Sequence, residues 1–217
     1  MNIGILGTGD VGQRLGSGFL SIGHDVKMGS RDPKNEALAA WVAANGSHAS
    51  GGTFADAAQF GEVVVLATAW SGTENVLRLA GPQNLAGKIV IDATNPLVVP
   101  SGATSLQLAL GWNDSAGEQV QRWLPGAKVV KCFNIVGNEY MIHPEFPGGP
   151  PDMFIAGNDA GAKATVAGFL KEFGWPPAID MGGIEGARLL EPLAMLWIQY
   201  GKRTGTWDHA FKLLRKS

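Results

Sequence analysis

The chain of 217 residues is long enough for one sizeable α/β domain with a small companion, and too short for a large second domain. Its composition, with 45% hydrophobic and 17% charged residues, is that of a folded globular protein and excludes a disordered chain. The formal net charge of −2 leaves no excess of cations to neutralise a phosphate backbone, so we expect no nucleic-acid partner.

Short apolar runs alternate with segments of helical periodicity through the first half of the chain, a pattern typical of parallel strands joined by crossover helices. Asp32 followed by Pro33 is typical of a capped helix start, and Thr53 with Asp56 resembles a capping box. The predicted elements are strand 2–6, helix 11–22, strand 25–28, helix 32–46, strand 47–50, helix 53–61, strand 63–68 and strand 89–93.

The second half continues this alternation after a stretch rich in Gly and Pro. Residues 146–151 cannot form regular structure, so 134–151 is predicted to be a loop, either a lid or a connector. The predicted elements are helix 116–124, strand 128–133, strand 153–156, helix 162–173, strand 178–181 and a final helix from about 184. We therefore expect an α/β fold with a Rossmann-type, doubly wound, mostly parallel sheet over 1–136. Residues 137–217 form a small C-terminal α/β extension, either separate or packed as one continuous domain.

The final helix is apolar on nearly every side over 189–198, which a single surface helix does not tolerate. It is either buried in the fold or shared with a second subunit, and we expect a homodimer. Arg188 and Glu191 are interpreted as an ion pair within this helix, because they stand three residues apart, with a role in ligand binding as the alternative.

No metal site is expected, since Cys132 is the only cysteine and the four histidines lack metal-ligand spacing. Cys132 is interpreted as a small buried hydrophobe. The chain opens on a strand pattern without a targeting segment, and its longest apolar run, 193–198, is far shorter than a membrane span. We expect a cytoplasmic protein with no membrane partner.

The segment Gly7-Thr8-Gly9-Asp10-Val11-Gly12 matches G-x-G-x-x-G between a predicted strand and a predicted helix. The first glycine permits a tight turn, the second lets a pyrophosphate approach the backbone, and the third lets the helix pack on the strand. The helix N-terminus then supplies N–H groups to the phosphates. A glycine-rich turn without a ligand is the weaker alternative, because three glycines would cost helix stability for no local gain. We expect all six residues to contact a dinucleotide.

The end of the second strand reads Gly29-Ser30-Arg31, where NAD-binding proteins usually have Asp or Glu for the ribose 2′-hydroxyl. Ser30, Arg31 and Lys34 instead suit a 2′-phosphate, because a hydroxyl and cations can bind it by charge-assisted hydrogen bonds. The sequence therefore favours NADP over NAD. Asp32 is the alternative ribose ligand, although with Pro33 after it a helix cap explains it better.

Two further candidate segments follow the strands 63–68 and 89–93, at the edge where parallel sheets bind ligands. Thr68-Ala69-Trp70 follows the first, with Trp70 either lining the nicotinamide side or anchoring the loop to the core. Asp92-Ala93-Thr94-Asn95-Pro96-Leu97 stands at the end of the second, with Asn95 either a hydrogen-bond partner of the ribose or carboxamide or part of a simple turn. Asn134, just past strand 128–133, is the third candidate of this kind.

These motifs, together with Ala187-Arg188-Leu189-Leu190-Glu191-Pro192-Leu193, resemble coenzyme F420-dependent NADP oxidoreductases and their bacterial dinucleotide-binding relatives. The chain also resembles the cytosolic reductase portion of STEAP-type metalloreductases. The resemblance implies that Thr8, Ser30 and Arg31 contact NADP, and that a deazaflavin stacks on the nicotinamide in a cleft beside the C-terminal part. Two positions depart from the family pattern: the loop reads Gly-Thr-Gly-Asp where Gly-Gly-Thr-Gly is frequent, and Ala69 stands where Pro is frequent. They leave open whether the second cofactor is F420, FMN or FAD.

A hydride-transfer function follows from this reading, with no catalytic acid or base assigned. Neither Tyr140 nor Tyr200 has Lys four residues on, so the acid of short-chain dehydrogenases is missing. Hydride transfer between two stacked rings needs alignment and exclusion of water rather than a proton donor. The alternative is an NADP(H)-binding redox sensor without catalysis. An open space for a second ring beside Trp70, Asn95 and Asn134 would favour the oxidoreductase.

Overall fold

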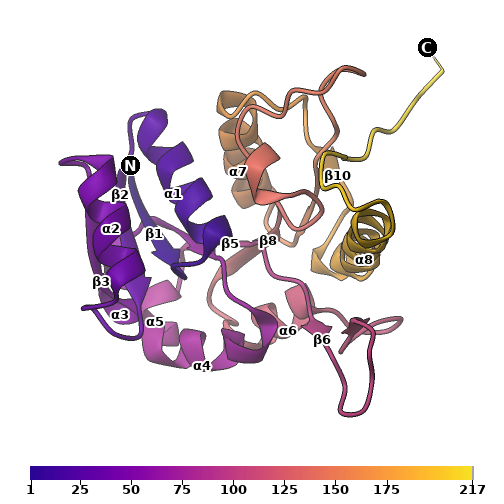
Figure 1. Ribbon diagram of the computed structural model, residues 1–217. Helices are drawn as coiled ribbons and strands as arrows, with labels where there is room; N and C mark the ends of the chain where they lie inside the picture. Colours follow the sequence, from indigo (N-terminus) through magenta and orange to yellow (C-terminus); the bar gives the residue numbers. More distant parts are fainter. Residues whose placement is uncertain (217) are drawn as a thin grey trace.

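An eight-stranded sheet runs through the middle of the protein, whose residues 1–216 are described in a computed structural model (Figure 1). The central strands are continuous apolar runs, because helices cover both faces of the sheet. Its strands are β1 (Asn2–Leu6), β2 (Asp25–Ser30), β3 (Ala49–Thr53), β4 (Val63–Leu66), β5 (Ile89–Asp92), β8 (Lys128–Lys131), β9 (Phe154–Gly157) and β10 (Ile179–Asp180).

The strands lie in the order β10-β9-β8-β5-β4-β1-β2-β3. Neighbouring strands from β3 to β8 are parallel, whereas β9 runs antiparallel to β8 and β10 parallel to β9. The strand order reverses between β1 and β4, which opens a crevice at the carboxyl ends of these two strands. The predicted Rossmann-type sheet is therefore confirmed, and the strands of residues 137–217 extend the same sheet beyond β8.

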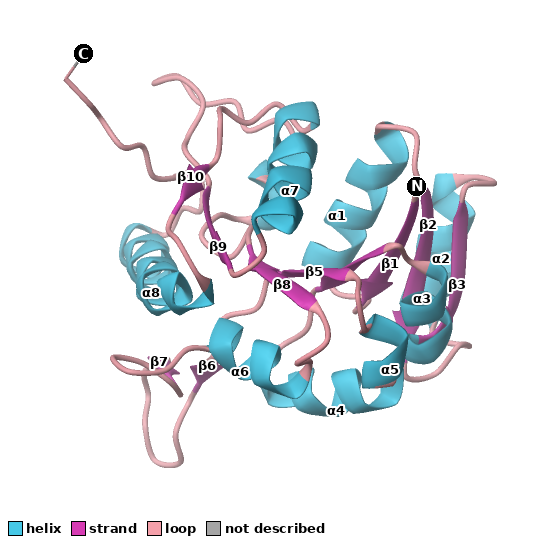
Figure 2. Ribbon diagram, turned by 180° about the vertical axis from the view of Figure 1, so that it is seen from behind, coloured by secondary structure: helices cyan, strands magenta, loops and turns pink. Residues whose placement is uncertain are grey.

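Two layers of helices cover the sheet, one on each face (Figure 2). The core of one face draws on α1, α2 and α7, and that of the other on α3 to α6. The helices are α1 (Asp10–Ser21), α2 (Glu36–Asn45), α3 (Phe54–Phe60), α4 (Trp70–Ala80), α5 (Pro82–Leu85), α6 (Ala116–Trp123), α7 (Ala160–Glu172) and α8 (Ala187–Thr204). The remaining elements are the hairpin β6 (Leu97–Val98) and β7 (Gln107–Leu108), and the 3₁₀ turns η1 (Asn138–Tyr140) and η2 (Ile184–Gly186).

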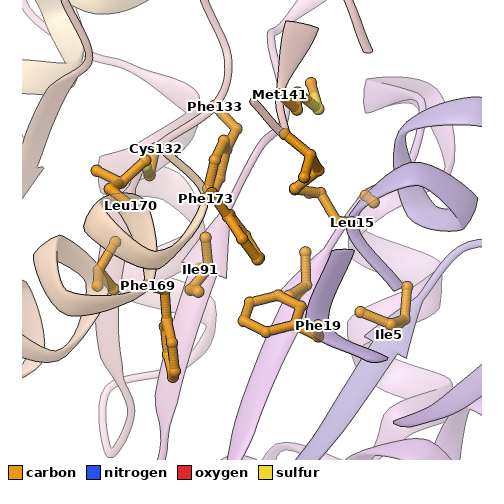
Figure 3. Packing of buried hydrophobic residues seen from close by; sticks show 14 of the residues in the cluster. Ile5, Leu15, Phe19, Ile91, Cys132, Phe133, Met141, Phe169, Leu170 and Phe173 are labelled. Carbon is orange, nitrogen blue, oxygen red and sulfur yellow. The ribbon is translucent and has the colours of Figure 1, made fainter. Parts of the chain in front are cut away.

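Aromatic side chains join the N-terminal and C-terminal halves of the chain on the α1 face. The ring of Phe19 from α1 meets Phe169 and Phe173 from the α7 region edge to face, each at 5.1 Å between ring centroids. Figure 3 shows these rings between Leu15 and Leu170. Because all of them are buried, the two halves share one hydrophobic core on this face.

Several elements differ from the sequence predictions. The helices α4 and α5 and the hairpin β6–β7 were not predicted, and α4 contains Gly72, Thr73 and Asn75, which are poor helix formers. Strand β3 covers Ala49–Thr53 instead of 47–50. Its glycines look like a strand break in the sequence, yet at Gly51 a Cβ would lie only 3.0 Å from Leu38, so close packing explains them.

The start of α2 corrects a second prediction. Asp32 does not cap this helix: its carboxylate accepts a hydrogen bond from the Lys34 N–H at 2.9 Å and closes a turn before the helix. Asn35 is the cap, with its side-chain oxygen 3.0 Å from the Leu38 N–H. The capping box of Thr53 with Asp56 at the start of α3 is confirmed.

The last helix, α8, is buried on one side only. Ala187, Leu190 and Ala194 face the interior, whereas Leu189 and Leu196 are 61% and 58% exposed. This apolar outer face is unlike that of an ordinary surface helix. Within residues 1–216, no helix is both long and apolar enough to cross a membrane.

Replacement of the observed cap tests this reading of α2. Asn35→Ala is expected to lower the free energy of unfolding by about 1 kcal/mol, because the first turn loses its side-chain acceptor. Asp32→Ala is the matched control and should have a smaller effect, since its hydrogen bond lies outside the helix. Urea denaturation measures both, and a larger loss for Asp32→Ala would contradict the assignment.

Candidate functional site

The glycine loop between β1 and α1 has two glycines fixed by packing and one that faces open space. Gly7 has a φ of +131°, and a Cβ there would lie 2.2 Å from the Ala67 carbonyl oxygen. At Gly12 a Cβ would lie 2.3 Å from the carbonyl oxygen of Gly7. At Gly9 a Cβ would meet nothing within 4 Å. The protein's own packing therefore does not require Gly9, and the space beside it suits a ligand that approaches the backbone closely.

The N-terminus of α1 starts at the same point. Gly9 is the N-cap residue and no side chain caps the helix, so its first N–H groups remain available to an anion. Asp10 lies in the exposed first turn, and the Thr8 carbonyl accepts a hydrogen bond from Gln13 Nε2 at 2.8 Å, which stiffens the loop. The loop and helix end fit a pyrophosphate, as the sequence motif predicts.

The end of β2 presents the groups that we predict to bind a 2′-phosphate. Ser30 is the last residue of the strand and is only 5% exposed, whereas Arg31 and Lys34 lie in the exposed turn that follows. Neither cation forms a salt bridge within residues 1–216. The two positive charges are thus available to an external anion.

A cavity of about 290 Å³ lies where the ends of β1, β4 and β5 converge. Its lining residues are Gly9, Asp10, Val11, Ala67, Thr68, Ala69, Ala93 and Asn138. The Thr68 hydroxyl lies 2.9 Å from that of Thr73, which fixes the start of α4. Trp70 stacks instead on Trp123 of α6, with ring centroids 5.5 Å apart, and packs against the core of the opposite face. This geometry favours the anchoring role for Trp70.

The predicted asparagines Asn95 and Asn134 lie side by side. Asn95 Nδ2 donates to the Asn134 backbone carbonyl at 2.8 Å, and Asn134 Nδ2 donates to Asn95 Oδ1 at 2.9 Å. Asn134 Nδ2 also donates to the carbonyl of Leu190. These contacts fix the orientation of both amides, because a flip of either would bring two oxygens together. Pro96, the next residue, is buried and its carbonyl binds the N–H of Ala109 in the hairpin region.

Phe133, the residue before Asn134, has a left-handed backbone with a φ of 65°. Such a conformation is unfavourable for a bulky residue and persists only where the surroundings impose it. The Phe133 ring is fully buried and lies 6.2 Å from the ring of Phe173, which holds it. The resulting turn brings Asn134 to Asn95, and Asn134 Oδ1 is left buried without a partner in residues 1–216.

Below these loops lies a fully buried charge cluster that sequence reasoning missed. Lys131 Nζ, at the end of β8, is 2.7 Å from an Asp92 carboxylate oxygen and 2.9 Å from one of Glu191. It also donates to the Thr94 carbonyl at 2.8 Å. Burial by itself lowers the pKa of Lys131, but the two carboxylates outweigh it and raise the pKa above its ordinary value. The ammonium therefore stays charged.

The partner of Glu191 corrects the prediction of an ion pair within α8. Glu191 faces the interior, where it pairs with Lys131 and accepts the N–H groups of Ala116 and Gly117 at the start of α6. Arg188 points toward α6 and donates to Glu118 Oε2 at 2.8 Å. Arg188 and Glu191 do not pair with each other, because each binds a residue of another element.

A second cavity, of about 520 Å³, adjoins the first at Asn138. Aromatic rings of Tyr140, Trp197 and Trp207 line it, with the indoles of Trp197 and Trp207 at 5.2 Å between centroids. His209 stacks on Trp197 at 4.8 Å between ring centroids. The open space beside the first cavity is therefore bordered by η1, α8 and the C-terminal segment, and not by the predicted Trp70, Asn95 and Asn134.

The predicted site residues thus separate into groups. Of the glycine loop, Gly9, Asp10 and Val11 line one cavity with Thr68 and Ala69, whereas Gly7, Thr8 and Gly12 are not part of its lining. Ser30, Arg31 and Lys34 lie together at the end of β2, and Asn95 pairs with Asn134. The sequence missed Asn138 in the lining of that cavity, whereas Ala93 belongs to the predicted segment 92–97 at the end of strand 89–93. Asn138 lies in a segment that the pattern marks only as irregular.

Comparison with known proteins gives three consistent results. A family model described as NADP oxidoreductase, coenzyme F420-dependent, matches residues 2–96. The F420-dependent NADP reductase of Methanothermobacter thermautotrophicus is 29% identical over 211 residues, covering 94% of this chain and 90% of that protein. The rat metalloreductase STEAP3 is 30% identical over 205 residues, which cover 89% of this chain but only 37% of that protein.

A solved structure is more similar still. A protein from Arthrobacter sp. FB24, described as a candidate F420-dependent NADP-reductase, is 39% identical to this chain. The superposition has a TM-score of 0.92 and covers 98% of this chain and 99% of the other. The similarity therefore extends through the C-terminal part as well as the glycine loop.

The glycine loop yields a direct test. Gly9→Ala should leave the melting temperature nearly unchanged, because the added methyl enters open space and the φ of −76° suits alanine. It should weaken dinucleotide binding at least about tenfold, or ~1.4 kcal/mol. Gly7→Ala is the contrasting variant and should be strongly destabilised by its clash with Ala67. Calorimetry and ligand titration measure both effects, and unchanged affinity in Gly9→Ala would refute the assignment.

Proposed function

The chain belongs to the coenzyme F420-dependent NADP oxidoreductase family, and from this premise we propose that it transfers a hydride between NADP(H) and a deazaflavin or flavin. The observation that carries the proposal is the pair of adjoining cavities, one at the glycine loop and one lined by aromatic rings. The curated methanogen relative is named for this reaction with F420. F420 is accordingly the first acceptor to test, with FMN and FAD as the alternatives.

NADP(H) binding is assigned to residues at three strand ends. The free N–H groups at Gly9 and the start of α1 would hold the pyrophosphate, and Ser30, Arg31 and Lys34 would hold the 2′-phosphate. The cavity beside Thr68 and Ala69 then receives the nicotinamide end. Asp32, the alternative ribose ligand, accepts a hydrogen bond from the Lys34 N–H and closes the turn before α2.

The nicotinamide ring supplies the hydride chemistry, and the protein aligns the two rings and excludes water. The aromatic cavity of about 520 Å³ falls within the usual range for small-molecule pockets and suits a planar ring system. Tyr140, Trp197 and Trp207 offer flat apolar walls against which such a ring packs. Hydride transfer between two aligned rings requires no acid or base from the chain, so the residues act by alignment.

Self-association through α8 is part of the proposal. Leu189, Pro192, Leu196 and Tyr200 form one exposed stripe along the outer face of this helix. Beside the stripe lies a cavity of about 770 Å³, at whose rim Trp112 is fully exposed. Apolar surface of this kind is typical of a protein interface, and a second copy of the chain is the occupant that we propose.

Cofactor preference is the first prediction that this proposed function makes. NADPH should bind at least about tenfold more tightly than NADH, ~1.4 kcal/mol, because Arg31 and Ser30 meet a phosphate that NADH lacks. Arg31→Ala should remove most of this difference without lowering the melting temperature, since Arg31 is exposed. Fluorescence titration measures the affinities. Equal affinities for the two cofactors in the wild type would contradict the proposal.

Acceptor preference is the second prediction and the main test of function. Anaerobic stopped-flow of NADPH oxidation should show turnover with F420, FMN or FAD and almost none with aldehydes or ketones. Simple carbonyls need a proton donor beside the developing alkoxide, whereas a deazaflavin or flavin delocalises the charge within its rings. Turnover of a small ketone with none for any flavin would overturn the proposal, and no turnover with any acceptor would favour the sensor.

The proposed dimer gives the third prediction. Light scattering should report a dimer for the wild type, and Leu196→Glu should shift it toward monomer, because the charge enters the apolar stripe. Leu79→Glu is the matched control: Leu79 is 39% exposed, lies on α4 and should leave the dimer intact. A wild-type monomer at all concentrations would refute the interface.

A further inference from the structure

Asn138, the first residue of η1, stands where three cavities meet. It lines the cavity at the glycine loop, the aromatic cavity beside Trp197, and a third hollow between α1 and α2. It is partly exposed, and its side-chain amide makes no hydrogen bond within residues 1–216. Asn138 is thus a polar residue at the boundary between the glycine-loop cavity and the aromatic cavity.

The segment that carries Asn138 is held from two sides. On one side, Arg14 of α1 donates from Nη2 to the carbonyl oxygens of Glu139 and Ile142, each at 3.0 Å. On the other side, a Cβ at Gly137 would lie 3.3 Å from the indole of Trp197, so the two are in close contact. Arg14 therefore ties η1 to the helix whose N-terminus faces the pyrophosphate position.

The neighbouring amides are not available for the same role. Asn134 uses both of its N–H groups, on Asn95 Oδ1 and the Leu190 carbonyl, and its own Oδ1 is buried, while Asn95 uses one N–H group on the Asn134 carbonyl and its oxygen on Asn134. Asn138 offers a free donor and a free acceptor on one planar group. This combination matches the carboxamide of nicotinamide and the imide edge of a flavin or deazaflavin, each of which has a carbonyl next to an N–H.

We propose that Asn138 is a binding residue shared by the two reactants, in contact with the nicotinamide carboxamide and with the ring of the acceptor. Arg14 is the positioning residue that holds Asn138 there through the Glu139 and Ile142 carbonyls. The inference rests on the proposed function, because it assigns the two adjoining cavities to the two partners of the hydride transfer. It predicts that Asn138 senses the nicotinamide end of the cofactor and not the adenosine end.

Binding without turnover tests Asn138 first. Asn138→Ala should weaken NADP⁺ binding several-fold and leave the affinity for adenosine 2′,5′-bisphosphate, which lacks the nicotinamide, unchanged. Asn113→Ala is the matched control, because this exposed asparagine lines none of the three cavities. Equal affinity for NADP⁺ in Asn138→Ala and wild type would overturn the proposal. So would a parallel loss for both ligands. Because no acceptor is present, this test stands even if the proposed reaction fails.

Single-turnover kinetics test the role of Arg14. With the acceptor that the wild type uses, Arg14→Gln and Asn138→Ala should each slow hydride transfer by at least about tenfold, while melting temperatures show that both variants fold. The double variant should be no slower than Asn138→Ala alone, because Arg14 acts through Asn138. Arg14→Lys, which keeps the charge and one donor to the carbonyls, should recover part of the rate. Multiplicative losses in the double variant would show that Arg14 does not act through Asn138.

Discussion

The arrangement of the site depends on one buried ionic contact, that of Lys131 with Asp92 and Glu191. Two carboxyl groups flank one ammonium, and all three side chains are at most 2% exposed. The N–H groups at the start of α6 also bind Glu191, at the positive end of the helix dipole. Desolvation makes such clusters weak contributors to stability, yet removal of Lys131 would leave two carboxyl groups buried without their cation.

This contact connects elements that are distant in the chain. Asp92 ends β5, Lys131 ends β8 and Glu191 belongs to α8, so the cluster brings the C-terminal helix to the edge of the sheet where ligands bind. The loop after β5 is fixed at the Thr94 carbonyl, and the loop after β8 by the left-handed Phe133. The charge cluster therefore fixes the ends of β5 and β8, and with them the positions of the Asn95 and Asn134 amides that follow these strands.

The sequence correctly predicted those features that depend on residues close together in the chain. The structure contains the glycine loop, the capping box at Thr53 and the apolar runs of the central strands. Each of these features arises from a short sequence pattern. The buried role of Lys131 could not be predicted, because its partners stand 39 and 60 positions away and no local pattern in the predicted strand 128–133 indicates them. The partner of Arg188 was predicted wrongly for the same reason. Arg188 pairs with Glu118, which is distant in the chain, and not with Glu191 of its own helix. Asn138 was missed because only the folded chain brings its loop to the glycine loop.

The continuity of the sheet limits how ligands can come and go. Strand β9 pairs with β8 through its backbone, and the rings of Phe169 and Phe173 pack on Phe19 across the same face. A hinge opening between the two halves would break this ladder and separate these rings at once, so the cleft does not open like the jaws of a two-domain enzyme. Exchange of either reactant would then depend on motion of the loops that line the two cavities, such as residues 137–140 and 205–208.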